Sequence, residues 1–154
     1  MTEDYIFDVD GTLMNVSLRL VRAKKNPPEG KRMDWDVFLD PIVMDECDYP
    51  QGDVVHMAKV LHDAGHKIII TSARNERHRK VTTDQLHRAG VNFTKLYLRK
   101  DDDFRHDDVV KAELLEQIRK DGFNPVTAFD DRDQVVEMWR KLGLNCYQVR
   151  AGKF

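Results

Sequence analysis

Short apolar runs alternate with helix-like segments along most of this chain, and this alternation restricts its fold more than any other feature. Five runs have the length and residue types of β-strands: residues 5–8, 67–71, 96–98, 126–129 and 146–149. Four intervening segments have apolar residues at helical spacing or end at a glycine: residues 54–61, 75–89, 107–120 and 133–142. Strands separated by helices pair in parallel through right-handed crossovers. The pattern predicts a three-layer, Rossmann-like α/β fold.

One segment, from about residue 14 to residue 52, breaks this alternation. It contains the loop 26–30, which is rich in proline, and a pattern that predicts one short helix over 34–43. No strand pattern occurs in it. We expect a small helical cap, inserted after the first strand of a single domain that covers residues 1–154.

Composition limits the environment and the partners of the protein. The 25 Lys and Arg residues against 27 Asp and Glu give a formal net charge of −2, which excludes a globally basic surface for nucleic acid. The first residues are too acidic for a signal peptide, and no apolar run has the length of a membrane span. Cys47 and Cys146 are far apart in the sequence, which favours free, buried thiols in a reducing compartment. We therefore expect a cytoplasmic protein without a membrane partner.

Acidic side chains follow two of the predicted strands. Asp8 and Asp10 come after the first strand, and Asp130 and Asp131 come after the strand 126–129. Ligands bind at the carboxyl ends of parallel strands, so these side chains are expected to meet at one edge of the sheet. For the Asp8/Asp10 pair alone, a functional site and a solvated turn or helix cap are equally good interpretations. The ordered set makes a functional site the better interpretation.

Carboxylates that gather at one place need a positive partner, and Mg²⁺ prefers oxygen ligands. One carboxylate could then attack phosphorus, and a second, two residues further on, could transfer the proton. Ser72 after the second strand and Lys111 in the first turn of a helix could stabilise the charge on the phosphoryl oxygens. Gly11 would allow the chain to turn sharply there.

These residues resemble the motifs of the haloacid dehalogenase-like (HAD) phosphohydrolases. The segment 8–13 matches the first motif, Ser72 the second, Lys111 the third and Asp130-Asp131 the fourth. The resemblance implies a Rossmann-like fold, Mg²⁺ dependence and an aspartyl-phosphate intermediate. It implies that Asp8 is the nucleophile and a metal ligand and that Asp130 is a metal ligand. It also implies that Asp10 is the general acid and base and offers its backbone carbonyl to the metal.

A narrower resemblance covers most of the chain. The segments 107–111 and 130–140 and the C-terminal tail are similar to the 3′-phosphatase domains of T-even phage polynucleotide kinase-phosphatases, which remove 3′-phosphates from DNA and RNA ends. Four residues are implied as substrate-binding: Arg19, Arg74, Thr12 and Asp131. Asp107 is implied as a catalytic residue, and its spacing of one helical turn predicts that it orients Lys111.

The expected function is therefore Mg²⁺-dependent removal of 3′-phosphates from polynucleotide ends. No GxxxxGK[ST] loop occurs, so a kinase or ligase would be a separate partner. A small-molecule nucleotidase, such as a deoxyribonucleotide phosphatase, and a non-catalytic module that binds nucleic-acid ends are the alternatives. The basic run 74–80 could contact a phosphate backbone or form a solvated helix face. Trp35 and Phe38 could stack on a terminal base or pin the cap to the core.

Overall fold

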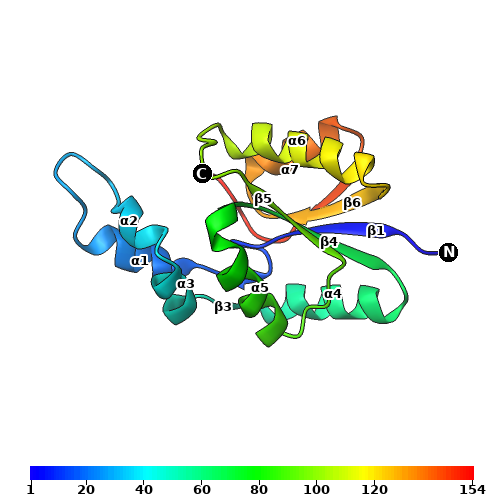
Figure 1. Cartoon of the computed structure of the whole chain (residues 1–154), viewed down its shortest axis with the longest axis horizontal. Helices are drawn as coiled ribbons and strands as arrows, with labels where there is room; N and C mark the ends of the chain where they lie inside the picture. The colour runs from blue at the N-terminus through cyan, green and yellow to red at the C-terminus, as the bar shows by residue number, and fades with distance from the viewer.

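A five-stranded parallel sheet lies between two layers of helices in the computed structural model, which describes residues 1–154 (Figure 1). The strand order is β5–β4–β1–β6–β7. The strands are β1 (Asp4–Asp8), β4 (Lys67–Asn75), β5 (Lys95–Arg99), β6 (Pro125–Asp130) and β7 (Asn145–Gln148). All five predicted strands are present, and the three-layer α/β class is confirmed.

Two helices cover each face of the sheet (Figure 1). The helices are α4 (Gly52–Asp63) and α5 (Arg79–Arg88) on one face and α6 (Asp107–Lys120) and α7 (Asp133–Lys141) on the other. Successive side chains of a strand point to opposite faces, so the central strand supplies both cores. Ile6 packs with the α6 and α7 side chains, and Phe7 packs with those of α4 and α5. Both residues are fully buried.

The cap lies beyond the end of β1, at the far end of the molecule from the N-terminus (Figure 1). Its elements are β2 (Met14–Asn15), α1 (Ser17–Lys25), α2 (Trp35–Phe38), α3 (Pro41–Cys47) and β3 (Tyr49–Pro50). The antiparallel pair of β2 and β3 closes the base of the cap. The expectation of one helix and no strand in this segment is therefore wrong.

The cap helices escaped prediction because apolar periodicity does not mark them. The buried residues of α1 are Arg19 and Ala23, so an arginine occupies the inward position where a pattern search requires an apolar residue. The predicted helix over 34–43 is two helices. Asp40 precedes Pro41, which disfavours helical backbone at Asp40, and the Asp40 carboxylate accepts a hydrogen bond from the Ile42 N–H as a new N-cap.

The boundary between β4 and α5 also differs from the prediction. Strand β4 continues to Asn75, a 3₁₀ turn η1 (Glu76–His78) follows, and α5 begins at Arg79 rather than at residue 75. The polar residues at the end of β4 still pair with β5, through an irregularity between Ser72 and Asn75. Pairing with a neighbouring strand, which local sequence does not encode, extends β4 beyond its apolar run.

The cysteines and the helix lengths can be compared directly with the sequence expectations. Cys47 and Cys146 are buried and form no disulfide, as predicted. The longest helix, α6, has 14 residues, and no helix has both the length and the apolar character needed to cross a bilayer.

The two faces of α6 predict a contrast in stability. Ile118 is fully buried against the sheet, whereas Val109 on the same helix is 42% exposed. Ile118→Ala should lower the free energy of unfolding by about 2–5 kcal/mol, because it leaves a cavity. Val109→Ala should change it by less than about 0.5 kcal/mol. Urea denaturation measures both, and equal effects would contradict the packing described here.

Candidate active site

Three buried carboxylates meet at the carboxyl edge of the sheet. Asp8 ends β1 and Asp130 ends the neighbouring strand β6, and Asp131 follows directly. One oxygen from each lies within 4.8 Å of the others. The sequence predicted that Asp8 and Asp130 would meet here, because adjacent parallel strands end at the same edge.

One ammonium group joins two of these carboxylates. Lys111, from α6, places Nζ 2.8 Å from Asp8 Oδ1 and 2.8 Å from Asp130 Oδ2. Thr12 donates its hydroxyl to Asp8 Oδ2 at 2.9 Å, and the indole of Trp139 donates to Asp130 Oδ2 at 3.1 Å. Trp139, predicted as core packing, therefore packs in the core and also orients an active-site carboxylate.

The site carries more negative than positive charge. Burial and the neighbouring Asp130 raise the pKa of Asp8 well above its usual value, and the same two causes raise the pKa of Asp131 to about 6. Burial would lower the pKa of Lys111, but Asp130 and Asp8 outweigh it and raise that pKa. One ammonium therefore faces three carboxylates. A set of oxygen ligands with surplus negative charge fits a hard divalent cation such as Mg²⁺.

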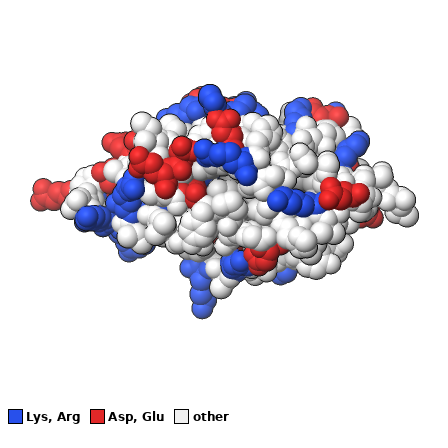
Figure 2. Space-filling view, turned by 90° about the horizontal axis from the view of Figure 1, so that it is seen from below, with Lys and Arg blue, Asp and Glu red and all other residues white.

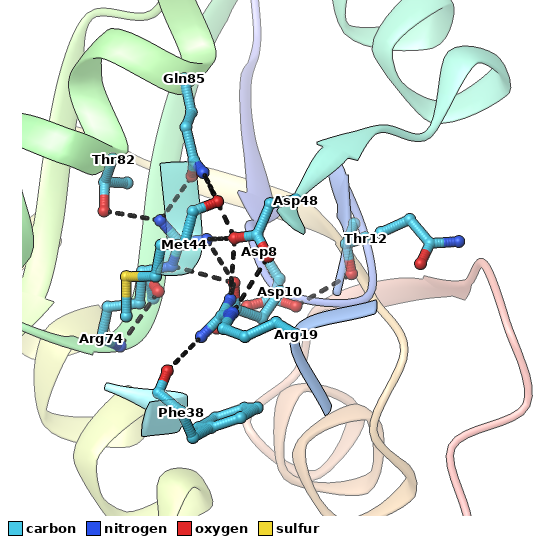
Figure 3. A network of polar contacts seen from close by, with 12 residues as sticks. Asp8, Asp10, Thr12, Arg19, Phe38, Met44, Asp48, Arg74, Thr82 and Gln85 are labelled. Carbon is cyan, nitrogen blue, oxygen red and sulfur yellow. Dashed lines mark hydrogen bonds and ion pairs between the residues drawn. The ribbon is translucent and has the colours of Figure 1, made fainter. Parts of the chain in front are cut away.

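Asp10 has a different environment although it lies two residues from Asp8. Its Oδ1 accepts from Arg19 Nη2 at 2.8 Å and from Arg74 Nε and Nη2 at 2.9 and 2.6 Å (Figure 3). Burial alone would raise the pKa of Asp10, but Arg74 and Arg19 outweigh it and hold that pKa at about 2. The Asp10 carboxylate thus belongs to an arginine network, while Asp131, predicted to bind substrate, has its carboxylate beside Asp8 and Asp130.

Neither predicted substrate-binding arginine faces the solvent. Arg19 and Arg74 are 0% and 3% exposed. Arg19 also donates to Asp48 and to the Phe38 carbonyl, and Arg74 also donates to three polar side chains, those of Thr82, Gln85 and Asp48. The guanidinium nitrogens of both arginines therefore donate to groups of the protein itself. The geometry gives them contact with Asp10 rather than open access to a phosphate.

Asp107 does not orient Lys111, and that prediction is wrong. The Asp107 carboxylate accepts from Arg99 Nη2 and from Arg132 Nη1, while Lys111 reaches inward to Asp8. Their spacing puts both residues on one side of α6, but burial separates them: the Asp107 side chain is 29% exposed and that of Lys111 only 3%. The partners of Asp107 are set by the fold, which brings Arg99 at the end of β5 and Arg132 at the start of α7 within reach of its carboxylate.

Ser72 and the basic run 74–80 lie next to this edge. Ser72 is buried and follows Thr71, which is in register with Asp8, and its hydroxyl accepts from the Arg74 N–H. In the basic run Arg79 pairs with Glu76 and Lys80 with Asp84. These ion pairs are exposed, so part of the run forms a solvated face, as one of the two interpretations predicted. Figure 2 shows acidic and basic side chains interspersed over the face that it draws.

The aromatic residues of the cap have unequal environments. Trp35 is 57% exposed and meets Phe38 edge to face, with ring centroids 5.7 Å apart. The guanidinium of Arg19 lies 4.6 Å from the centre of the Phe38 ring. Phe38 therefore packs on Arg19 within the cap, while Trp35 leaves ring surface open.

Several residues that shape the site were missed in the sequence. The buried Gln51 donates Nε2 to the carbonyls of Gly11 and Thr12, both at 2.7 Å, and so supports the loop after β1. Gly152 packs so closely that an added Cβ would lie 1.8 Å from the Asp131 carbonyl oxygen. Asp48 and Gln85 complete the arginine network. No local pattern marks these residues, because each acts through a partner distant in sequence.

Position 11 requires glycine for two reasons, its backbone conformation and the close approach of Asp131. Its φ is +82°, and an added Cβ would lie 2.1 Å from Asp131 Oδ2. Gly122 has a φ of +96° with nothing within 4 Å of an added Cβ, so it is a matched control for backbone strain alone. Gly122→Ala should cost about 1–2 kcal/mol of unfolding free energy, and Gly11→Ala should cost more.

Chemical denaturation of the two glycine variants measures that difference. In an Asp131→Ala background the collision disappears, so the cost of Gly11→Ala should fall toward that of Gly122→Ala. A cost that stays the same in this background would show that the carboxylate does not crowd Gly11.

Comparison with known proteins agrees with this geometry. The family described as the polynucleotide kinase PNKP phosphatase domain matches residues 2–154. A chain in the structure of the Pnkp1/Rnl/Hen1 complex is 28% identical, with a TM-score of 0.80. The alignment covers 100% of this chain and 48% of that one, so this chain spans about half the length of that relative.

Other similar structures share the fold at low identity. A haloacid dehalogenase-like hydrolase from Streptococcus pneumoniae is 12% identical with a TM-score of 0.70, covering 96% of this chain and 84% of that chain. The D,D-heptose 1,7-bisphosphate phosphatase from B. bronchiseptica, solved with magnesium and phosphate, is 11% identical with a TM-score of 0.63, covering 96% and 80%. Because the family match extends over nearly all of the sequence, this chain belongs to the PNKP phosphatase-domain family of HAD phosphohydrolases.

Proposed function

We propose that this HAD-type phosphatase removes 3′-phosphates from the ends of DNA or RNA through an aspartyl-phosphate intermediate. The observation that carries the proposal is the pair of opposed environments at the end of β1. Asp8 lies beside Lys111 and two further carboxylates, and Asp10 lies beside two arginines. Such a division suits a nucleophile and a proton-transfer group that act on the same phosphoryl group.

In the first step, a carboxylate oxygen of Asp8 attacks phosphorus and the bond between phosphorus and the 3′-oxygen breaks. Asp10 gives its proton to the leaving 3′-oxygen, which departs as a hydroxyl group. Lys111 and Ser72 lie at the same edge and would stabilise the charge on the transferring group. Because the arginines keep Asp10 ionised in the free protein, it must take up this proton as the anionic substrate binds.

In the second step, Asp10, now a carboxylate, removes a proton from water. The water oxygen attacks phosphorus, the bond to Asp8 breaks, and inorganic phosphate leaves. Asp8 returns as a carboxylate and Asp10 is protonated again. The low pKa of Asp10 means that the free protein then returns to its ionised form.

Asp8, Asp130 and Asp131 would hold a Mg²⁺ ion, with the backbone carbonyl of Asp10 as a further ligand implied by the family motif. When bound, the ion neutralises carboxylate charge and draws the oxygens of a phosphate toward Asp8. Neutralisation would keep Asp8 ionised despite its raised pKa. This supports a divalent-metal requirement for turnover.

The cap, about residues 14–52, is our candidate for substrate selection, because it lies beyond the end of β1 (Figure 1) and its Arg19 contacts Asp10. The exposed ring of Trp35 could stack on a terminal base. Nucleic-acid ends as substrate and a kinase or ligase partner are supported by the family and by the similar chain, solved within what is described as an RNA repair complex.

Asp8→Asn should abolish phosphate release from a 3′-phosphorylated oligonucleotide, because an amide cannot form the acyl phosphate. Released inorganic phosphate is measured with Mg²⁺ and with a chelator, and the chelator should also stop the reaction. Asp102→Asn, a change in the solvated run 101–103, is the control and should keep wild-type turnover. Full turnover by Asp8→Asn would contradict the mechanism.

A comparison of kcat/KM on the oligonucleotide and on mononucleotides separates the two phosphatase candidates. The formal net charge of −2 gives no overall basic field for a polynucleotide, and this makes the nucleotidase a specific competitor. A strong preference for mononucleotides would favour it, and end binding without turnover would favour the non-catalytic module.

Mg²⁺ should raise the melting temperature, and more at pH 7.5 than at pH 5. The pKa of Asp131, raised to about 6, means that protons compete with the metal at the lower pH. Because the pKa of Asp131 is raised on folding, the folded state holds a proton on Asp131 that the unfolded state has already released. The metal-free protein should therefore lose stability as pH rises from about 4 to about 6. At 100 times its Kd the ion adds about 2.7 kcal/mol.

Thermal denaturation with and without Mg²⁺ measures this effect. Asp130→Asn should remove the shift, and Asp102→Asn should keep it. A shift that survives Asp130→Asn would place the cation elsewhere.

A further inference from the structure

A buried carboxylate at the base of the cap has no role in the proposed chemistry. Asp48 follows α3 and precedes β3, and its side chain is 0% exposed. It accepts from Arg19 Nε and Nη2, both at 3.0 Å, and from Arg74 Nη2 at 2.9 Å (Figure 3). Gln85 of α5 also donates to it, at 3.3 Å. Asp48 thus shares both arginines with Asp10, because Nη2 of each arginine donates to both carboxylates.

The charges in this network balance only with Asp48 present. Two guanidinium groups face two carboxylates, those of Asp10 and Asp48. Without Asp48, two buried arginines would share one carboxylate, and their mutual repulsion would favour separation. Asp48 therefore allows both arginines to approach the same oxygen of Asp10.

The arginines contact only one of the two oxygens of Asp10. Oδ1 accepts three N–H groups from Arg19 and Arg74, whereas Oδ2 accepts none from the protein. The Asp10 side chain is also 29% exposed, unlike the arginines behind it. This arrangement orients the carboxylate and leaves Oδ2 available for a substrate.

The network also joins two parts of the molecule. Arg19 and Asp48 belong to the cap, whereas Asp10, Arg74 and Gln85 belong to the sheet and α5. Gln85 strengthens the joint by accepting from Arg74 Nη1 at 2.7 Å and donating to the Met44 carbonyl at 2.9 Å. The seat of the cap and the orientation of Asp10 therefore depend on the same buried contacts.

We propose that Asp48 is a positioning residue: it holds Arg19 and Arg74 on Oδ1 of Asp10, so that Oδ2 meets the leaving oxygen of the substrate. This inference rests on the proposed function, in which Asp10 protonates that oxygen. It predicts a defect in proton transfer, because the nucleophile Asp8 and its partner Lys111 lie outside the network.

The test compares leaving groups. The 3′-oxygen of an oligonucleotide leaves poorly without a proton, whereas p-nitrophenolate leaves readily as an anion. Asp48→Asn should lower kcat/KM for the 3′-phosphorylated oligonucleotide by about 10²-fold and for p-nitrophenyl phosphate by less than about threefold. Equal losses on both substrates, or no loss, would overturn the proposal.

Two further variants separate positioning from folding. Asp45 lies on α3, three residues before Asp48, and pairs with Arg88 at the surface, so Asp45→Asn should leave both rates unchanged. Gln85→Ala removes partners of Arg74 and Asp48 without removing a charge. It should give the same selective loss, smaller in size, even if Asp48→Asn does not fold. A Gln85→Ala loss that is equal on both substrates would overturn the proposal.

A failure of the proposed substrate gives a different result. Wild-type protein that hydrolyses p-nitrophenyl phosphate but not the oligonucleotide would contradict 3′-end repair. The leaving-group test of Asp48 would then use, in place of the oligonucleotide, the alkyl phosphate that the wild-type protein cleaves best. Hydrogen exchange adds a readout independent of turnover. Asp48→Asn or Gln85→Ala should speed exchange of the α1 amides more than Asp45→Asn does, and unchanged exchange in both would overturn the proposal.

Discussion

Lys111 lies between two carboxylates that end neighbouring strands, and the geometry of the active edge depends on these contacts. Asp8, Asp130 and Lys111 come from β1, β6 and α6, so one ammonium group joins both central strands to a covering helix. Removing three charges from water is costly, and the mutual attraction offsets this cost only while all three are present. Asp131 adds a further negative charge that the protein does not neutralise. Surplus charge at a buried site suits a divalent cation and an anionic substrate.

The two aspartates after β1 illustrate how neighbouring groups give identical side chains different chemistry. Burial and Asp130 raise the pKa of Asp8, whereas two arginines hold that of Asp10 at about 2. The backbone turn at Gly11 brings the chain back toward Asp131, where no larger residue fits. The cap then supplies Arg19 and Asp48 to the Asp10 side of the site. The same contacts thus seat the cap and orient Asp10.

Sequence reasoning succeeded where the signal was local. Apolar runs and glycine stops located the five strands and the helices around them, and the acids after β1 and β6 located the site. It failed where polar groups replace apolar ones. Helix α1 was missed because Arg19 is its buried anchor, and Asp107 was assigned to Lys111 although Arg99 and Arg132 bind it. The catalytic and binding roles assigned to individual residues stay predictions.

The sequence by itself determined the α/β class, the family and which residue types gather at the sheet edge, because strand and helix periods and short motifs are local properties of the chain. Only the tertiary structure decided which charge pairs with which. Asp48, Gln51 and Gln85 gained their roles from partners distant in the chain: Asp48 lies 29 residues from Arg19, Gln51 lies 40 residues from Gly11, and Gln85 lies 37 residues from Asp48. Burial makes such pairings compulsory, since an unpaired polar group in the interior is costly, but the fold alone determines which partners are within reach.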